Sequence, residues 1–516
     1  MADRAVAGRM QRPAKVGTGK ATALITLAVG VAVLIYALDL TVVATAAPTI
    51  VGEFHALGLY GWLFSAYAIP ATATTLLYGR LADVYGRKRL FAIVMAGFLA
   101  GSVACGLAGS MLQLVVFRAL QGLFAGATFP LAVGVIADVY PIEQRARGFS
   151  IVPFTFALAS VLGPTAGGVI TDSLGWRWIF FLNVPVVLLA IGILAVVYHE
   201  DRPARQATLR HVDVPGALLF AAGLATLLAG ISTGVNNVSG LSWQTVAALI
   251  SGLALLAAFV VRERRAASPL LPLRILRHRG LGGALLTIGL LIWITNSLLF
   301  FIPSLAQGVL GGTARSAGLI LIPLMLTWSL VALVSLRAGQ RIGFRIVALI
   351  GCAALAGALV VLAMVGPHDT QQALILPMLL AGLGAGMINP NMMLLAQHSL
   401  SDRDQGLAGG LANCTMSLTA ALVAPILGAL EVSRLAAHFG RSPSEPSLLL
   451  AAAGRHQLGV QFGGAYVHGL QVALGAALHD VFAAGFIALA LIVVWLLVVV
   501  PSNAVVRRIR LAPLSR

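Results

Sequence analysis

Residues 38–48 read Leu-Asp-Leu-Thr-Val-Val-Ala-Thr-Ala-Ala-Pro and place one carboxyl group, that of Asp39, inside a long apolar run. The run is long enough for a membrane-spanning helix, which needs about 20 apolar residues. An aspartate near the centre of such a helix costs roughly 2.5–3.5 kcal/mol on insertion scales. We therefore expect Asp39 to have both a function and a partner.

The composition indicates a polytopic membrane protein. Of 516 residues, 59% are hydrophobic and only 10% are charged, against about 25% in an ordinary soluble domain. The apolar sequence forms runs of about 20 residues between short charged or Gly/Pro-rich loops, whereas strands of a membrane barrel would alternate. We predict an all-α integral membrane protein of 14 transmembrane helices. Their centres lie near residues 33, 70, 99, 124, 161, 189, 223, 253, 291, 325, 355, 385, 418 and 488.

Basic residues predict the orientation of these helices. If alternate loops face the cytoplasm, 28 of the 34 Lys and Arg residues lie on that side and five lie outside. This bias is the positive-inside pattern. We expect a multi-pass protein of the inner (cell) membrane with cytoplasmic tails at 1–20 and 501–516. The net charge of +17 then reflects topology and attraction to anionic lipid, and not nucleic-acid binding.

An internal repeat relates the first and last six predicted helices. The segment Gly122–Pro130 recurs at Gly382–Pro390, and Pro164 recurs at Pro425, about 260 residues later. Two parallel six-helix repeats place a binding site at their interface. The predicted parts are an N-terminal bundle at 21–200, two inserted helices at 201–265 and a C-terminal bundle at 266–500, with an outer loop at 431–479.

Arg118 is the one basic residue that falls deep inside a predicted span. Counting along the helices at 1.5 Å per residue puts Asp39 and Arg118 at a similar depth, roughly 10 Å below the outer surface. Burial favours the neutral carboxyl group and a nearby guanidinium favours the carboxylate, so Asp39 is suited to bind and release a proton. Gln121, one turn from Arg118, is expected to share its hydrogen bonds. The alternative is a static buried ion pair.

The loop after the second span, Gly79–Arg89, combines glycines with charge. Basic residues alone would reflect topology. The glycines permit a tight turn, and Asp83 sits among cations, so we predict a latch that closes in one conformation and opens in another. Asp138 and Arg145, which follow the fourth span, are expected to be part of the same latch. The predicted latch residues are Gly79, Asp83, Gly86, Arg87, Lys88, Asp138 and Arg145.

These motifs resemble those of the major facilitator superfamily, and within it the fourteen-span drug:proton antiporter branch. Residues 79–89 resemble the superfamily's signature loop, which implies a gating role. Residues 38–48 resemble the first-span motif of the branch, and Arg118–Gly122 its proton-coupling motif. The fifth span contains Gly163, Pro164, Gly167 and Gly168, which resemble the antiporter motif that seals the outer half of the protein.

The sequence departs from the branch in two places. Thr45 stands where the branch often has Asn, and residues 406–430 contain no acid, although some cation exporters of the branch carry acids in late spans. Recognition of polyvalent cations is therefore not expected. Uncharged polar and aromatic residues favour a lipophilic substrate, although each is equally suited to bridge helices. The candidate cavity residues are Trp62, Tyr67, Asn296, Gln307, Asn389, Asn391 and Asn413.

We expect a proton-coupled secondary antiporter that exports hydrophobic, cationic drugs or toxic compounds by alternating access. Its partners would be a small lipophilic substrate, protons and membrane lipid, and we expect a monomer. One alternative is an exporter of an endogenous lipid, siderophore or metabolite, and another is a transport-inactive membrane sensor or scaffold. The sequence shows no catalytic nucleophile, metal-ligand spacing or nucleotide-binding loop, so we expect no enzyme, metal or cofactor, and a proton gradient as the driving force.

Overall fold

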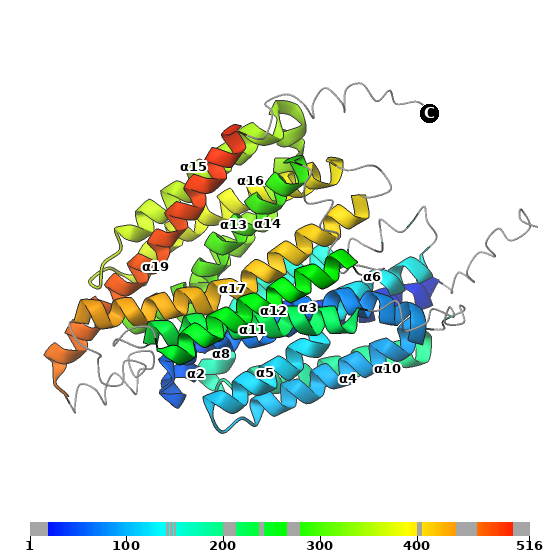
Figure 1. Ribbon diagram of the computed structural model, residues 1–516, viewed down its shortest axis with the longest axis horizontal. Helices are drawn as coiled ribbons and strands as arrows, with labels where there is room; N and C mark the ends of the chain where they lie inside the picture. The colour runs from blue at the N-terminus through cyan, green and yellow to red at the C-terminus, as the bar shows by residue number, and fades with distance from the viewer. Residues whose placement is uncertain are drawn as a thin grey trace, which may run out of the picture.

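The computed structural model describes residues 19–140, 144, 148, 151–198, 200, 213–236, 242–265, 279–399, 405–439 and 462–498. Regular structure in these residues is helical throughout (Figure 1). Twelve of the helices are long and apolar enough to cross a membrane. Helices α3 and α8 are not among the twelve, although they contain 24 and 23 residues. The all-helical class is therefore confirmed, and the count of 14 spans stays a prediction.

The first group of helices runs to residue 197. It comprises α2 (Gly19–Phe54), α3 (Trp62–Tyr85), α4 (Arg87–Gly106), α5 (Met111–Ala125), α6 (Thr128–Val139), α8 (Ile151–Ser173), α9 (Trp178–Phe181) and α10 (Asn183–Val197), with the 3-10 turn η1 (Leu57–Leu59). Helices α5 and α6 together form one candidate span. We call this group the N half.

The remaining helices form a pair and a second group. The pair is α11 (Val214–Asn236) and α12 (Trp243–Arg265). The second group, the C half, comprises α13 (Arg279–Ser304), the π-helical turn η5 (Leu305–Val309), α14 (Ala314–Ile342), α15 (Phe344–Ala363), the 3-10 turn η6 (Gln371–Leu374), α16 (Ile375–His398), α17 (Gln405–Phe439) and α19 (Gly464–Val498).

Glycines at positive φ make the tight turns between α3 and α4 and between α14 and α15. Gly86 has φ +84° and Gly343 has φ +102°. Side chains rarely adopt this conformation, whereas glycine adopts it freely. Both turns lie at the same end of the molecule, which we call the basic end because it carries Arg87 and Lys88. The opposite end carries the turn between α2 and α3.

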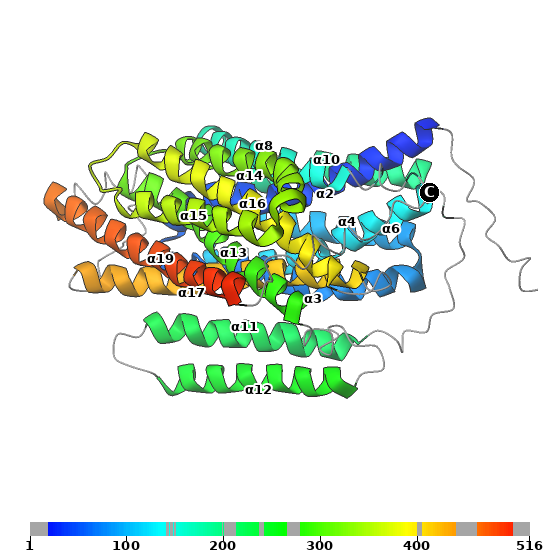
Figure 2. The ribbon, with the colours of Figure 1, turned by 90° about the horizontal axis from the view of Figure 1, so that it is seen from above.

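Helices α11 and α12 form a layer of their own against one side of the bundle (Figure 2). Leu224 and Leu228 of α11 pack against Ile69 of α3 and Ala421 of α17. Gly252 brings α12 against the backbone of α11 at Leu227. Of the two helices, α11 therefore makes the principal contact with the N and C halves, and α12 packs mainly on α11.

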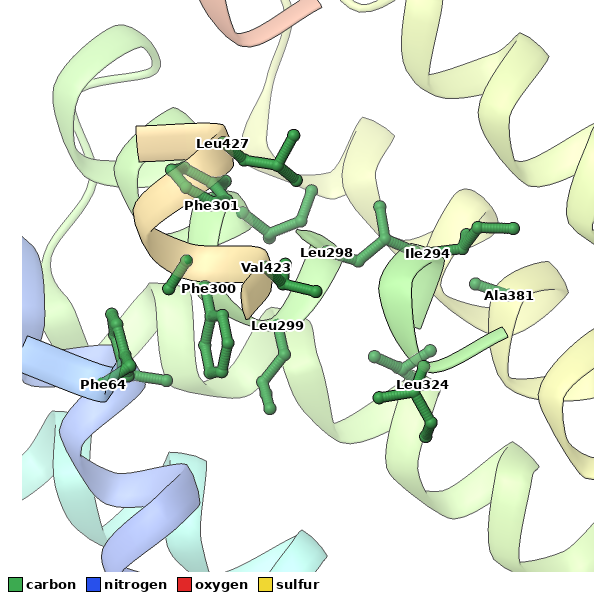
Figure 3. Packing of buried hydrophobic residues seen from close by; sticks show 14 of the residues in the cluster. Phe64, Ile294, Leu298, Leu299, Phe300, Phe301, Leu324, Ala381, Val423 and Leu427 are labelled. Atoms are coloured by element: carbon green, nitrogen blue, oxygen red, sulfur yellow. The ribbon is translucent and has the colours of Figure 1, made fainter. Parts of the chain in front are cut away.

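Aromatic side chains join the N and C halves near the opposite end (Figure 3). Phe64 of α3 stacks on Phe300 of α13, with ring centroids 4.2 Å apart. Tyr60, in the turn between α2 and α3, packs on Phe301 at 5.5 Å and donates a hydrogen bond to the carbonyl of Phe300. The two halves are therefore in close contact at this end.

The structure is helical at both ends of the predicted outer loop 431–479. Helix α17 continues to Phe439 and α19 begins at Gly464. Charged residues of these two helices pair with each other: His438 lies 2.9 Å and Arg434 3.6 Å from the carboxylate of Asp480. Helices of 35 residues span about 52 Å at 1.5 Å per residue, so they extend beyond a bilayer core of about 30 Å.

One smaller boundary difference concerns the N-terminal tail. Helix α2 begins at Gly19, inside the predicted tail 1–20. The predicted tail 501–516 lies outside the described residues.

Candidate functional site

Asp39, Arg118 and Gln121 form a buried cluster between α2 and α5. Arg118 Nη1 lies 2.5 Å from Asp39 Oδ2, and Gln121 Nε2 donates to Asp39 Oδ1 at 3.1 Å. Arg118 also donates to Gln121 Oε1 at 2.8 Å. Only 5% of Asp39 and 1% of Arg118 are exposed. The structure thus brings together the three residues that the sequence grouped by depth, and each carboxylate oxygen has a donor.

The rest of the guanidinium surface is covered by groups that sequence reasoning missed. Arg118 Nε donates to the carbonyl of Leu63 at 3.3 Å, and the guanidinium carbon lies 4.2 Å from the ring centroid of Tyr67. Phe180 is farther, at 5.9 Å. A cation over an aromatic face is stabilised by the ring quadrupole. Arg118 therefore keeps alternative contacts if its bond to Asp39 is lost.

Two glycines permit the close helix packing behind this cluster. A Cβ atom on Gly122 would collide with the carbonyl oxygen of Tyr67, and one on Gly101 would lie 2.7 Å from the Cα of Gln121. Helix α5 therefore approaches α3 and α4 at backbone distance. This approach positions Tyr67 and Gln121 on either side of Arg118.

At the basic end, Arg87 of α4 binds α6, and Tyr198 adds the end of α10 to the same group of contacts. Its guanidinium lies 2.5 Å from Asp138 of α6 and donates to the carbonyl of Gly134 at 2.7 Å. Tyr198, after α10, donates to Asp138 at 2.8 Å, and burial, with a further contribution from Asp138, raises the pKa of Tyr198. Tyr198 is therefore a neutral hydrogen-bond donor to the ion pair.

Glu200 is a second partner at this end. Its carboxylate accepts the backbone N–H groups of Arg87 at 2.8 Å and Lys88 at 3.2 Å. An acid at a helix N-terminus stabilises the exposed N–H groups and the helix dipole. Lys88 Nζ instead donates to the carbonyl of Ala195 at 2.7 Å. Of the predicted latch residues, the side chain of Asp83 and all of Arg145 lie outside the described part of the chain, and Gly79 is placed only as part of α3.

The glycines of α8 face two different helices. A Cβ atom on Gly163 would collide with Thr41 Oγ1 of α2, and one on Gly167 would lie 2.5 Å from Thr45 Oγ1. On the other side, a Cβ atom on Gly168 would collide with the carbonyl of Ala314 in α14.

A glycine of α14 completes this close packing. A Cβ atom on Gly318 would collide with the carbonyl of Pro164. Helix α8 is therefore packed closely between α2 of the N half and α14 of the C half.

Polar contacts add to the closure of the opposite end. Gln307 Nε2 donates to the carbonyl of Thr45 at 3.1 Å, and Thr49 donates to Gln307 Oε1 at 3.3 Å. Ser65 of α3 donates to the carbonyl of Ala421 in α17 at 2.7 Å. These bonds join the N half to the C half. Gln307 is thus engaged in contacts between the halves rather than free to bind a ligand.

The other candidate cavity residues lie on α3, α13, α16 and α17. Trp62 packs on the apolar cluster shared by α3, α11 and α17. Asn391 is fully buried and donates to the carbonyl of Met387 at 2.8 Å, within its own helix. The buried amide nitrogen of Asn389 and the buried hydroxyl of Tyr67 have no hydrogen-bond partner in the part of the chain that the structure describes. Asn296 and Asn413 are half-buried.

Two hollows in the described part of the chain lie away from the cluster of Asp39, Arg118 and Gln121. The first, of about 600 Å³, opens near Lys88 and Glu200, and the second, of about 510 Å³, runs along α4 and α10 past Ala100. Both lie along α4 and α10, on the far side from the junction of the halves. Neither includes a candidate cavity residue, so neither is the predicted substrate site.

The chain matches known transporters in sequence and in fold. Residues 29–425 match the model of the Major Facilitator Superfamily. Multidrug transporter protein MdtP of Bacillus subtilis (strain 168) is 31% identical over 80% of this chain and 76% of its own length. Puromycin resistance protein pur8 of Streptomyces alboniger is 29% identical over 90% of this chain and 89% of its own length.

Among solved structures, an inward-facing, unoccupied bacterial homologue of the human lysosomal transporter Spinster superposes with a TM-score of 0.65. It covers 94% of this chain and 99% of its own, at 14% identity, which shows a shared fold alone. With the family match over most of the sequence, these comparisons agree with the helical architecture. The chain belongs to the Major Facilitator Superfamily and is a multi-pass membrane transporter, not an enzyme.

Proposed function

We propose that this protein is a proton-coupled antiporter that exports hydrophobic, cationic compounds by alternating access. The observation that carries the proposal is the Asp39 carboxylate, buried in the membrane-spanning part and bonded through both oxygens to Arg118 and Gln121. Isolated buried acids in membrane helices mark proton and substrate pathways. The sequence relatives named as multidrug and puromycin resistance proteins support drugs as the substrate class.

The geometry suggests how proton binding changes the site. Protonation of Asp39 neutralises the charge that holds Arg118, so the ion pair weakens. Arg118 then keeps its contacts with Tyr67 and the carbonyl of Leu63. Loss of the proton restores the pair. Two arrangements that differ by one proton are what a coupled transporter needs, because each conformation can then favour one of them.

The closed opposite end supports alternating access. Gln307, Ser65 and Tyr60 join the N half to the C half there. The bias of basic residues assigns the basic end to the cytoplasm. We infer a bacterial inner-membrane protein that acts as a monomer, with 14 helices, both termini in the cytoplasm and its outer end closed in this structure. It would use no cofactor or metal.

Transport into inverted membrane vesicles with an imposed pH gradient tests the proposal. A panel of cationic dyes, neutral dyes and fluorescent lipids would be offered to wild type and to Asp39→Asn. We expect gradient-driven accumulation of cationic dyes by wild type, accompanied by proton release from the vesicles, and neither in the variant. Accumulation of dye without proton movement would reject antiport. Accumulation of labelled lipid alone would favour the endogenous-lipid alternative.

A further inference from the structure

Glu431 is a buried acid that the mechanism above does not use. It lies on α17, two turns before the helix ends at Phe439, and it is 0% exposed. Neither carboxyl oxygen has a hydrogen-bond partner among the residues that the structure describes. Because the sequence around it was assigned to an outer loop, its burial was not expected. An acid with both oxygens unpaired requires a physical explanation.

The surroundings of Glu431 belong to both halves of the protein. Tyr60, in the turn between α2 and α3, is close enough for its charge to interact with that of Glu431, and Ser304 of α13 lies beside the Tyr60 hydroxyl. One turn before Glu431, Leu427 lies near Phe301 in the same apolar cluster (Figure 3). Among the described residues, Tyr60 is the titratable group whose charge interacts with that of Glu431.

The other charged groups near the end of α17 have partners of their own. Arg434 and His438 pair with Asp480 of α19. The side chain of Arg434 is 53% exposed, so it projects toward solvent rather than into the junction. Glu431 is therefore not neutralised by the cations that follow it on its own helix.

These contacts determine the protonation state of Glu431 in the closed conformation. An ionised carboxylate that is removed from water and given no partner is strongly destabilised, and such a group takes up a proton instead. Opening the outer end would separate Tyr60 and the α2–α3 turn from α13 and α17. Water would then reach Glu431, and the free-energy cost of ionising its carboxyl group would fall.

We propose that Glu431 is a second proton-binding site, which belongs to the outer gate and is distinct from Asp39. It holds one proton while the gate is closed and releases that proton to outside water when the gate opens. Closure takes one proton back from the same side, so the site adds no net proton transport. A low external pH therefore favours the closed gate. This inference rests on the orientation and alternating access of the proposed function.

Spin-label distances across the gate test the proposal. Labels at Gly58→Cys and Ala437→Cys, both at exposed positions, would report opening in liposomes, with the three native cysteines replaced by alanine. We expect the open fraction of this double variant to rise as the external pH is raised. Adding Glu431→Gln should hold the gate closed over a wider pH range and weaken the pH response, leaving only the part that Asp39 contributes. The control Glu53→Gln removes a half-exposed acid that pairs with Arg177 within the N half and should leave the response intact.

Two further measurements make the outcome decisive. Infrared spectra of the closed protein labelled with ¹³C-glutamate should contain a band from a protonated carboxyl group, and Glu431→Gln should remove that band. If the wild type lacks the band, the proposal is overturned, and this result does not depend on whether the variant folds. An unchanged pH response in Glu431→Gln also overturns it. Asp39→Asn should abolish coupled transport but keep the part of the gate's pH response that Glu431 contributes, so failure of the proposed antiport and failure of this site give different results.

Discussion

Asp172 of α8 accepts the backbone N–H of Arg315 in α14 at 2.8 Å, so an acid of the N half caps a helix of the C half. The same carboxylate accepts the N–H of Ala314 at 3.3 Å. A side chain that satisfies the free N–H groups of a helix typically stabilises it by about 1 kcal/mol. Here the two partners belong to different halves. The contact therefore stabilises the closed end opposite the basic end, as well as the helix.

Replacing this cap is expected to shift the conformational equilibrium. Asp172→Ala should raise the ratio of open to closed outer gate about fivefold, which corresponds to about 1 kcal/mol. The gate labels described above would measure it. Thr313→Ala is the matched control, because Thr313 caps the same helix from within the C half through Ser316. If both variants shift the gate equally, Asp172 acts on helix stability and not on closure.

Asp39→Asn and Asp39→Ala should separate proton coupling from stability. Both remove the titratable group, so gradient-driven transport should fall to background in vesicles. Alanine also leaves Arg118 buried without its partner, and breaking a buried pair in this way costs about 3–5 kcal/mol. Asparagine keeps an oxygen that can accept from Arg118. We therefore expect a clearly lower thermal unfolding temperature for the alanine variant only; normal transport by either would exclude Asp39 from coupling.

The ion pair of Arg87 and Asp138 should control the rate of conformational exchange. Their side chains are 22% and 18% exposed, so solvent weakens the pair and the effect on stability should be small. Arg87→Gln should change the exchange rate, measured by single-molecule fluorescence, more than the substrate Kd. We expect the same of Asp83→Asn and Gly86→Val. Arg89→Gln, at an exposed neighbouring position, is the control, and a raised Kd at a normal exchange rate would argue against a latch.

Gly163 and Thr41 offer a test by compensation. A Cβ atom at residue 163 would collide with the Thr41 hydroxyl, so Gly163→Ala should separate α8 from α2 and slow transport. Overpacking of this kind typically costs about 1–3 kcal/mol. Thr41→Ala removes the obstructing oxygen but keeps the Thr41 Cβ, which would lie 2.8 Å from the new methyl group, so the double variant should recover stability and rate in part. If the double variant is no more stable and no faster than Gly163→Ala, then the collision with Thr41 is not what makes glycine necessary at residue 163.

The pattern of the sequence predicted the parts of the site that depend on depth and periodicity. Asp39 and Arg118 were matched because a charge in an apolar run is conspicuous and helix rise converts position into depth. Gly86 was assigned to a turn because few residues tolerate the conformation. Asp172 and Glu200 were missed, since both lie at helix ends among ordinary charged residues. Their role depends on which N–H groups the fold brings to them.

Glu431 was missed for a different reason. Arg434 and His438 follow it closely, and charges in such density indicate a loop when membrane helices are assumed to end at the bilayer surface. Helix α17 instead continues, and its charges pair with α19. Hydropathy does not distinguish a buried acid near the end of a long helix from a solvated one. Only the packing of Tyr60 and its neighbours reveals that Glu431 is covered.

Helices α11 and α12 should affect stability more than specificity, because they lie as a layer beside α3 and α17. A Cβ atom on Gly252 would lie 2.6 Å from the backbone nitrogen of Leu227, and backbone cannot move aside as a flexible side chain can. Gly252→Leu should therefore push the two helices apart and lower thermal stability, by about 1–3 kcal/mol for overpacking.

The matched control is Leu253→Val at the adjacent position, where the side chain is 58% exposed. It should leave stability nearly unchanged, since no described helix covers that side chain fully. Relative transport rates across the dye panel should be the same in both variants and in wild type, after correction for the amount of folded protein. A change of substrate preference in Gly252→Leu at normal expression would mean that the α11–α12 pair contributes to the transport pathway.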